Sequence, residues 1–330
     1  MATPATVHAP PPRRERRGRS LARQESLAGL GFILPTLLII IVVVIVPVLW
    51  TIMLAFQHIR LINIRQASLF NAYSFDNFKA VLESSDFRSS LITTLVYTIG
   101  GTVTSIGLGL IAALIVRKPF RGRGFVRGIM LLPYVAPVVA VTFVWQIMLN
   151  PQFGIGNHLG VSVLGWHHTI PFLSEQRGTL SLLGVTVHPP TALLTVIAFE
   201  AWRYFPFSFL FLLARLQAVP GETEEAARMD GATPSQLFAY VIWPELRPVI
   251  ATLAVLRFIW TFNKFDDVYL LTGGSAGTQV ASVRVYQLLT TQFNVGQAAA
   301  QAAVLAVILL VCLAFYFIAF GRRSGLGAQV

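Results

Sequence analysis

Long apolar runs constrain this 330-residue chain more than any other feature. A helix rises 1.5 Å per residue, so about 20 residues cross the roughly 30 Å hydrocarbon core of a bilayer. Four runs are long enough and almost free of charge, and two more are long enough but contain charged residues. In chain order the six are 30–56, 91–116, 125–149, 191–213, 249–271 and 295–320. We therefore predict an all-α integral membrane protein with six transmembrane helices.

Composition excludes the usual soluble classes. Charged residues make up 12% of the chain, about half the usual share of a soluble domain, which is about 25%. Hydrophobic residues make up 55%, more than a disordered chain contains. Cys312 is the only cysteine, so a disulfide scaffold is excluded.

The positions of the basic residues predict the orientation. The net charge of +11 could suggest a nucleic-acid partner, but the arginines cluster before the first run and beside later ones. With the N-terminus inside, 16 Lys/Arg lie in cytoplasmic segments and six lie outside. Because positive residues favour the cytoplasmic side, both termini are expected there, and no nucleic-acid partner is expected. The expected parts are an Arg/Pro-rich, disordered cytoplasmic leader (1–26), a transmembrane domain (27–321) and a cytoplasmic tail (322–330).

The chain has no nucleotide-binding loop of its own. A P-loop needs glycine immediately before its lysine, whereas the three lysines follow Phe78, Arg117 and Asn263. Any ATP hydrolysis must therefore belong to another polypeptide.

Short patterns in the sequence raise two other chemistries. The segment 273–277 matches G-x-S-x-G, and an intramembrane serine protease is one alternative, but the last run holds no histidine to act as its base. A glycine-rich turn is the expected structure there. Four of the six histidines share the segment 150–190 without the paired spacing of a metal site, so no metal is expected.

The segment between the fourth and fifth runs (217–248) is predicted to form two short helices around one glycine. The first begins after Pro220 and stops at Gly231, since glycine readily ends a helix. The second begins with Thr233 as its cap and is expected to end at Pro244.

The spacing in this segment resembles a known family. Glu225-Ala226-Ala227, then Gly231 and Pro244, resemble the EAA loop of permease subunits in binding-protein-dependent ATP-binding-cassette (ABC) importers. Four further sets of residues are similar to its carbohydrate-uptake branch, the maltose-permease and glycerol-phosphate-permease type. They are 107–114, Arg127 with Leu132-Pro133 and Trp145, 216–220, and 265–274. The residues at 275–277 depart from the family's Gly-Pro, which limits how far a substrate preference can be carried over.

The resemblance implies a type I ABC importer permease with no cofactor of its own. Its partners would be a second permease subunit (a heterodimer), a dimer of ATPase subunits that bind ATP and Mg, an extracytoplasmic solute-binding protein and the lipid bilayer. It would sit in a prokaryotic plasma membrane and pass a sugar, polyol or glycerol phosphate. The residues implied in ATPase coupling are Glu225, Ala226, Ala227, Asp230, Gly231 and Pro244. A self-sufficient channel or secondary carrier is the other alternative, since it would not need a coupling loop.

Charges inside the fourth and fifth runs indicate the solute path, because charges within spans usually face a cavity or one another. On one helix, Arg257, Trp260, Lys264 and Asp267 would share an arc of about 80°. Lys264 and Asp267 could instead merely neutralise each other. The full candidate set is Glu200, Trp202, Arg203, Tyr204, Arg257, Trp260, Asn263, Lys264, Asp266 and Asp267.

Depth within the bilayer predicts one specific contact in this set. Counted by helical rise, Glu200 and Arg257 share one layer. We expect them to face the same internal cavity and to interact, with Arg203 as the competing partner of Glu200.

Overall fold

A computed structural model describes residues 29, 31–163, 165–166, 168–178, 180–182 and 185–320. The chain divides into two units, Met1–Met53 and Leu54–Val330, which are described separately. The predicted leader (1–26) and tail (322–330) lie outside the described residues. The described part of the first unit is helical and belongs to an apolar helix over Gly31–Ala55, which includes α2 (Val46–Ala55).

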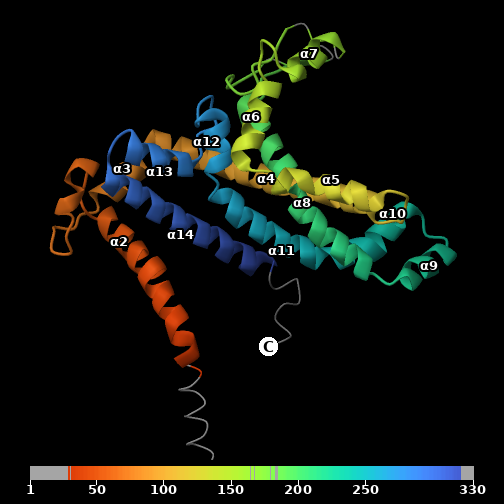
Figure 1. The fold of residues 1–330 in the computed structure, drawn as a ribbon, viewed down its shortest axis with the longest axis horizontal. Coiled ribbons are helices and arrows are strands. Elements are labelled where there is room, and N and C mark those ends of the chain that lie inside the picture. The colour runs from red at the N-terminus through yellow and green to blue at the C-terminus, as the bar shows by residue number, and fades with distance from the viewer. Residues whose placement is uncertain are drawn as a thin grey trace, which may run out of the picture. The chain divides into compact units, whose positions relative to one another are not determined.

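The second unit is built almost entirely of helices (Figure 1). They are a 3-10 helix (Leu61–Gln66), α3 (Asp76–Glu83), α4 (Ser85–Val116), α5 (Arg123–Val135), α6 (Val138–Met148), α7 (Ile155–Ser162), α8 (Thr191–Ala218), α9 (Gly221–Met229), α10 (Pro234–Gln236), α11 (Trp243–Phe262), α12 (Asp266–Thr272), α13 (Ala281–Thr290) and α14 (Val295–Phe320). A short antiparallel hairpin, β1 (Leu180–Leu182) and β2 (Val185–Val187), was not predicted; it pairs Leu180 with Val187.

Length and composition identify the helices that could cross a membrane. Among the described residues five single helices qualify, and α5 with α6 makes a sixth if this bent pair is one span. The single helices cover Gly31–Ala55, Ser85–Ile115, Thr191–Ala218, Pro234–Phe262 and Val295–Ile318. The helical membrane class predicted from the apolar runs is therefore confirmed.

Helices α4 and α8 form the centre of the second unit and approach closely at small residues. A Cβ added to Gly109 would lie 2.7 Å from Ser208 Cβ and 2.8 Å from the backbone nitrogen of Phe209. A Cβ on Gly101 would lie 2.8 Å from Glu200 Cγ. Glycine at these positions lets the two backbones come together, as is common between membrane helices.

The third run is not one straight helix. Helices α5 and α6 meet at a bend of 95°, because Pro137 has no N–H to donate and its ring disfavours helical geometry at the preceding residue. Ala136 accordingly has an extended conformation, with ψ of 143°. The sequence predicted the length of this span but not its break.

The prediction of one helix over 249–271 is wrong. Helix α11 ends at Phe262, and α12 starts at Asp266 with Asp267 in its first turn. Acidic residues are favoured at a helix N-terminus, so this pair suits the start of a new helix better than the middle of an old one.

The prediction that Pro244 ends the second short helix is also wrong. Thr233 and Gln236 do form a capping box, with Pro234 at the first position, but the backbone stays helical through Leu237–Ile242 into α11. Leu237–Ile242 is π-helical, and a π-helical turn rearranges the backbone hydrogen bonds next to the residue that cannot donate.

Candidate functional site

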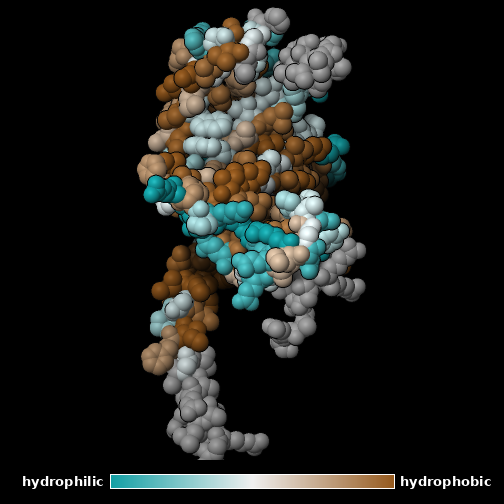
Figure 2. All heavy atoms as spheres, turned by 90° about the vertical axis from the view of Figure 1, so that its right-hand side faces the viewer, coloured by the Kyte–Doolittle hydropathy of each residue, from teal (hydrophilic) through white to brown (hydrophobic). Residues whose placement is uncertain are grey.

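Glu225-Ala226-Ala227, the start of the EAA loop, lie on helix α9 at the end of the bundle where α8 finishes (Figure 1). Helix α9 starts after Pro220 and ends at Met229, and Gly231 follows with φ of +80°, a value that favours glycine. The predicted first helix and its stop are therefore confirmed. Figure 2 views this end of the molecule and shows hydrophilic residues gathered in a band beside hydrophobic surface.

The residues implied in coupling differ in exposure. Glu225, Ala226 and Asp230 are exposed, and the neighbouring Met229 is 89% exposed. Ala227 is half-buried and packs against the core cluster formed by α4, α8 and α11. One side of α9 therefore faces the bundle, and the other is free to meet a partner.

Glu224, which the sequence reasoning missed, attaches α9 to the bundle. One of its carboxylate oxygens accepts a hydrogen bond from Arg117, at the end of α4, and the other lies 3.5 Å from Arg228 Nη2. Burial lowers the pKa of Arg117, and the nearby charge of Arg228 lowers it further. The carboxylate of Glu224 therefore compensates two guanidinium groups at this junction.

The predicted contact between Glu200 and Arg257 is confirmed. Arg257 Nη2 donates to Glu200 Oε1 over 2.5 Å, and the side chains are 1% and 0% exposed. Tyr97 donates to the other carboxylate oxygen at 3.0 Å, and Thr261 donates to Oε1 at 2.9 Å. These hydrogen bonds join α4, α8 and α11. Because neither charge reaches solvent, the two residues do not line an open cavity in this conformation, although the prediction placed them at one.

Arg203 is not the partner of Glu200. Its guanidinium donates to the carbonyl oxygens of Pro133 at 3.3 Å and Ala136 at 3.1 Å. The Pro133 carbonyl would normally accept from the residue four positions later, which is Pro137 and has no N–H. Arg203 therefore satisfies a carbonyl that the break between α5 and α6 leaves free.

Tyr204 lies among three cations. Its ring centroid is 4.1 Å from Lys264 Nζ, 4.5 Å from Arg257 Cζ and 5.6 Å from Arg203 Cζ. Its hydroxyl accepts a hydrogen bond from Lys264 at 2.6 Å. Lys264 also lies 3.7 Å from buried Asp267, so the neutralising pair weighed from the sequence does form.

The predicted arc does not exist as one helical face, because the chain leaves the helix between Phe262 and Asp266. Trp260 is 44% exposed, and Asn263 and Asp266 are exposed beside the break. Trp202 is half-buried and packs against Trp145 at 5.5 Å. The candidates therefore divide into a buried ionic core and an exposed group formed by Trp260, Asn263 and Asp266.

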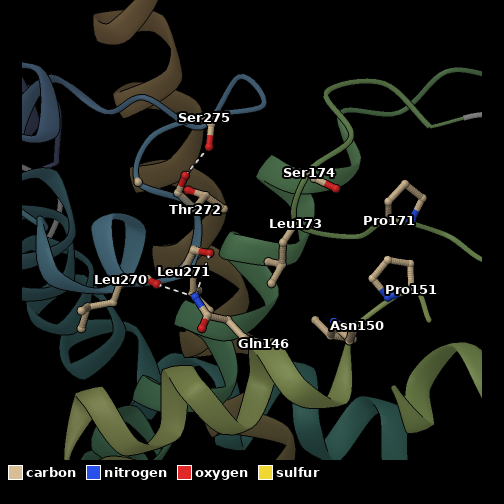
Figure 3. Close-up of a pocket in the computed structure, with 12 residues that line it drawn as sticks. Gln146, Asn150, Pro151, Pro171, Leu173, Ser174, Leu270, Leu271, Thr272 and Ser275 are labelled. Atoms are coloured by element: carbon tan, nitrogen blue, oxygen red, sulfur yellow. Dashed lines mark hydrogen bonds between the residues drawn. The ribbon is translucent and has the colours of Figure 1, made fainter. Parts of the chain in front are cut away.

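A cavity of about 370 Å³ lies between α6, the segment 171–174 and the end of α12 (Figure 3). The Gln146 amide points towards α12 and donates to the carbonyl oxygens of Leu270 at 2.7 Å and Leu271 at 3.3 Å. Leu271 packs with residues from the start of α8, whereas α9 follows the end of α8. The cavity and α9 therefore lie towards opposite ends of α8.

The protease and metal alternatives gain no support. Ser275 lies in a turn that contains left-handed glycines, and its hydroxyl donates to the carbonyl oxygen of Thr272 (Figure 3). Within the described residues no three His, Cys, Asp or Glu side chains are grouped to hold a metal ion.

Comparison with known proteins gives the family. Residues 105–322 match the family described as "Binding-protein-dependent transport system inner membrane component". The chain belongs to this family. It is thus a permease subunit of an ABC importer and a multi-pass membrane protein, and ATP is hydrolysed by separate subunits.

Similar permeases span most of the chain. The inner membrane ABC transporter permease protein YcjO of Escherichia coli is 36% identical and covers 71% of this chain and 74% of its own. The sn-glycerol-3-phosphate permease protein UgpA of Agrobacterium fabrum is 32% identical, over 73% and 78%. The trehalose/maltose permease protein MalF of Thermococcus litoralis is 29% identical, over 92% and 96%.

A solved structure shares the fold. A chain of a bacterial ABC transporter that imports the acidic polysaccharide alginate superposes with a TM-score of 0.75 at 22% identity, over 94% of this chain and 99% of that one. The ABC importer permease fold implied by the resemblance is therefore confirmed.

Proposed function

We propose that this permease subunit imports a sugar or a sugar-like solute, such as an oligosaccharide, a disaccharide or a glycerol phosphate. Two of its relatives are transport-system permeases for sn-glycerol-3-phosphate and for trehalose/maltose, which supports this class. The solute would be delivered by an extracytoplasmic binding protein, and a related importer has been solved in complex with such a periplasmic protein.

The exposed side of α9 carries the coupling part of the proposal. Glu225, Ala226 and Met229 project from a helix whose opposite side Glu224 ties to α4. This side would dock on one subunit of an ATPase dimer that binds ATP and Mg, while a second permease subunit presents its own loop to the other. When the ATPases close, the ion pair would transmit the movement of α9 to α4.

The exposed residues at the break between α11 and α12 are the proposed solute contacts. Trp260 offers an aromatic face on which a sugar ring can stack, and Asn263 and Asp266 offer hydrogen-bonding groups for its hydroxyls. The buried group of Glu200, Arg203, Arg257 and Asp267 would hold this surface in place.

The proposed topology has six spans in a prokaryotic plasma membrane, with both termini cytoplasmic. The segments assigned to the inside contain 16 Lys/Arg and those assigned to the outside contain six, which supports this topology. Cysteines introduced at Ser20 or Ser324 should resist an impermeant thiol reagent added from outside, and one at Ser162 should react. Reversed labelling would overturn the orientation.

A test of coupling uses Glu225→Lys and Gly231→Asp in the assembled transporter. Uptake should be lost while the variants remain in the membrane, because one reverses a charge on the docking side and the other adds a side chain where φ is +80°. Glu83→Lys, which reverses an exposed charge on α3 and leaves α9 unchanged, is the charge-matched control. Normal uptake and ATPase co-purification in both variants would show that the loop is only a connector.

A further inference from the structure

The segment formed by the connection between α4 and α5 and the first five residues of α5 is unusually basic. Five of its residues are Lys or Arg, and we name the segment 117–127 the basic elbow: Arg117, Lys118, Arg121, Arg123 and Arg127. Arg117 pairs with Glu224. Within the part of the chain that the structure describes, no carboxylate lies within ion-pair distance of the other four.

The side chains of Arg123 and Arg127 have more N–H donors than there are acceptor atoms around them. With its amide oxygen turned towards them, Gln217 accepts from Arg123 at 3.0 Å and from Arg127 at 2.7 Å. Arg127 also donates to the carbonyl oxygen of Val116 at 3.3 Å. The Nε atoms of both arginines are buried and have no acceptor in the described structure. Two guanidinium groups therefore share neutral acceptors only, and their positive charge is uncompensated.

The elbow must lie at a membrane surface. It joins Ser85–Ile115, a helix long and apolar enough to cross a membrane, to the bent pair that begins at Arg123, so it starts where a candidate span ends. Phe120 and Phe125 are 44% and 74% exposed, and Leu132, further along α5, is 61% exposed. Exposed aromatic residues beside cations are typical of segments that lie between the headgroups and the acyl chains.

The contact between Arg117 and Glu224 places the elbow on the same side as α9. The ligand must be an anion held at that surface. A phosphodiester supplies the oxygen acceptors that the arginines lack, and acyl chains supply the apolar partner that the phenylalanines lack. A free anion would satisfy only the first need.

We propose that the basic elbow binds the headgroup of an anionic phospholipid in the leaflet on the side of α9. Exposed Lys118 and Arg121 attract the phosphate, Arg123 and Arg127 form the inner wall, and Phe120 and Phe125 enter the acyl boundary. Because Arg117 belongs to the same segment, the bound lipid would steady the end of α4 against which α9 is held.

The test measures lipid retention by the purified full-length subunit. The probe is phosphatidylglycerol, compared with phosphatidylcholine of the same acyl chains, and bound lipid is counted by native mass spectrometry. The variant Lys118→Gln/Arg121→Gln removes two exposed charges and leaves the contacts of Gln217 in place. The matched control, Arg65→Gln/Lys79→Gln, removes two exposed charges elsewhere.

The wild-type subunit and the control should retain phosphatidylglycerol in preference to phosphatidylcholine. The elbow variant should bind phosphatidylglycerol about 30-fold more weakly, since each basic residue near an anionic surface contributes about fivefold. Phe125→Ser should weaken retention with every charge in place.

Equal retention of the two lipids, or equal losses in the elbow variant and the control, would overturn the proposal. Displacement by inorganic phosphate, with no effect of Phe125→Ser, would assign the site to a free anion instead. The readout does not involve transport, so failure here leaves the proposed function standing.

Discussion

The ion pair between Arg117 and Glu224 should hold α9 on the bundle, and Glu224→Gln tests it. The two side chains are 16% and 11% exposed. Breaking a fully buried pair costs about 3 to 5 kcal/mol, whereas an exposed pair is worth about 0 to 1 kcal/mol. We therefore expect a local loss of about 1 to 3 kcal/mol, intermediate between these limits.

Hydrogen exchange of the α9 amides measures this loss directly. If α9 opens locally, its amides should exchange about 5- to 150-fold faster in Glu224→Gln, the factor that corresponds to the expected free energy. Arg117→Gln should act alike, and the double variant should lose little more than either single one, because both changes remove the same contact. Amides at the centre of α8 should be unaffected.

Glu225→Gln is the matched control, since it neutralises the adjacent, exposed glutamate. In the isolated subunit it should leave the exchange of α9 unchanged. In the assembled transporter, Glu224→Gln should uncouple ATP hydrolysis from uptake with ATPase subunits still bound. Unchanged exchange in Glu224→Gln, or equal acceleration in both glutamine variants, would refute the reasoning.

Two further predictions concern the bundle. Arg257→Ala should reduce uptake and thermal stability by leaving Glu200 buried and unpaired, and Glu200→Gln combined with Arg257→Gln should recover part of both; a double-mutant cycle with no coupling would contradict this. Gly109→Val should lower the melting temperature, because a Cβ there meets the α8 backbone, whereas Gly107→Val, with nothing within 4 Å, should have little effect; similar melting temperatures would show that α4 and α8 do not pack tightly there.

Local signals in the sequence predicted both limits of α9 and the start of α10. Pro220 and Gly231 mark the two limits of the first short helix, and Thr233 caps the second, as the structure shows. Proline positions did not predict where helices end, because the effect of a proline depends on the backbone hydrogen bonds around it. Pro244 lies within a helical segment that follows a π-helical turn. Pro137 lies at the break between α5 and α6, where the chain bends by 95°.

The sequence by itself determined the membrane class, the absence of a nucleotide-binding loop and the EAA segment, because each depends on residues close together in the chain. The pairing of Glu200 with Arg257 could be anticipated from depth alone, but its burial could not. Arg117 and Glu224 are 107 positions apart, and no local pattern links them. The burial of Glu200 with Arg257 and the partner of Glu224 were decided only by the tertiary structure, since they depend on how closely α4 and α8 pack and on where the helices break.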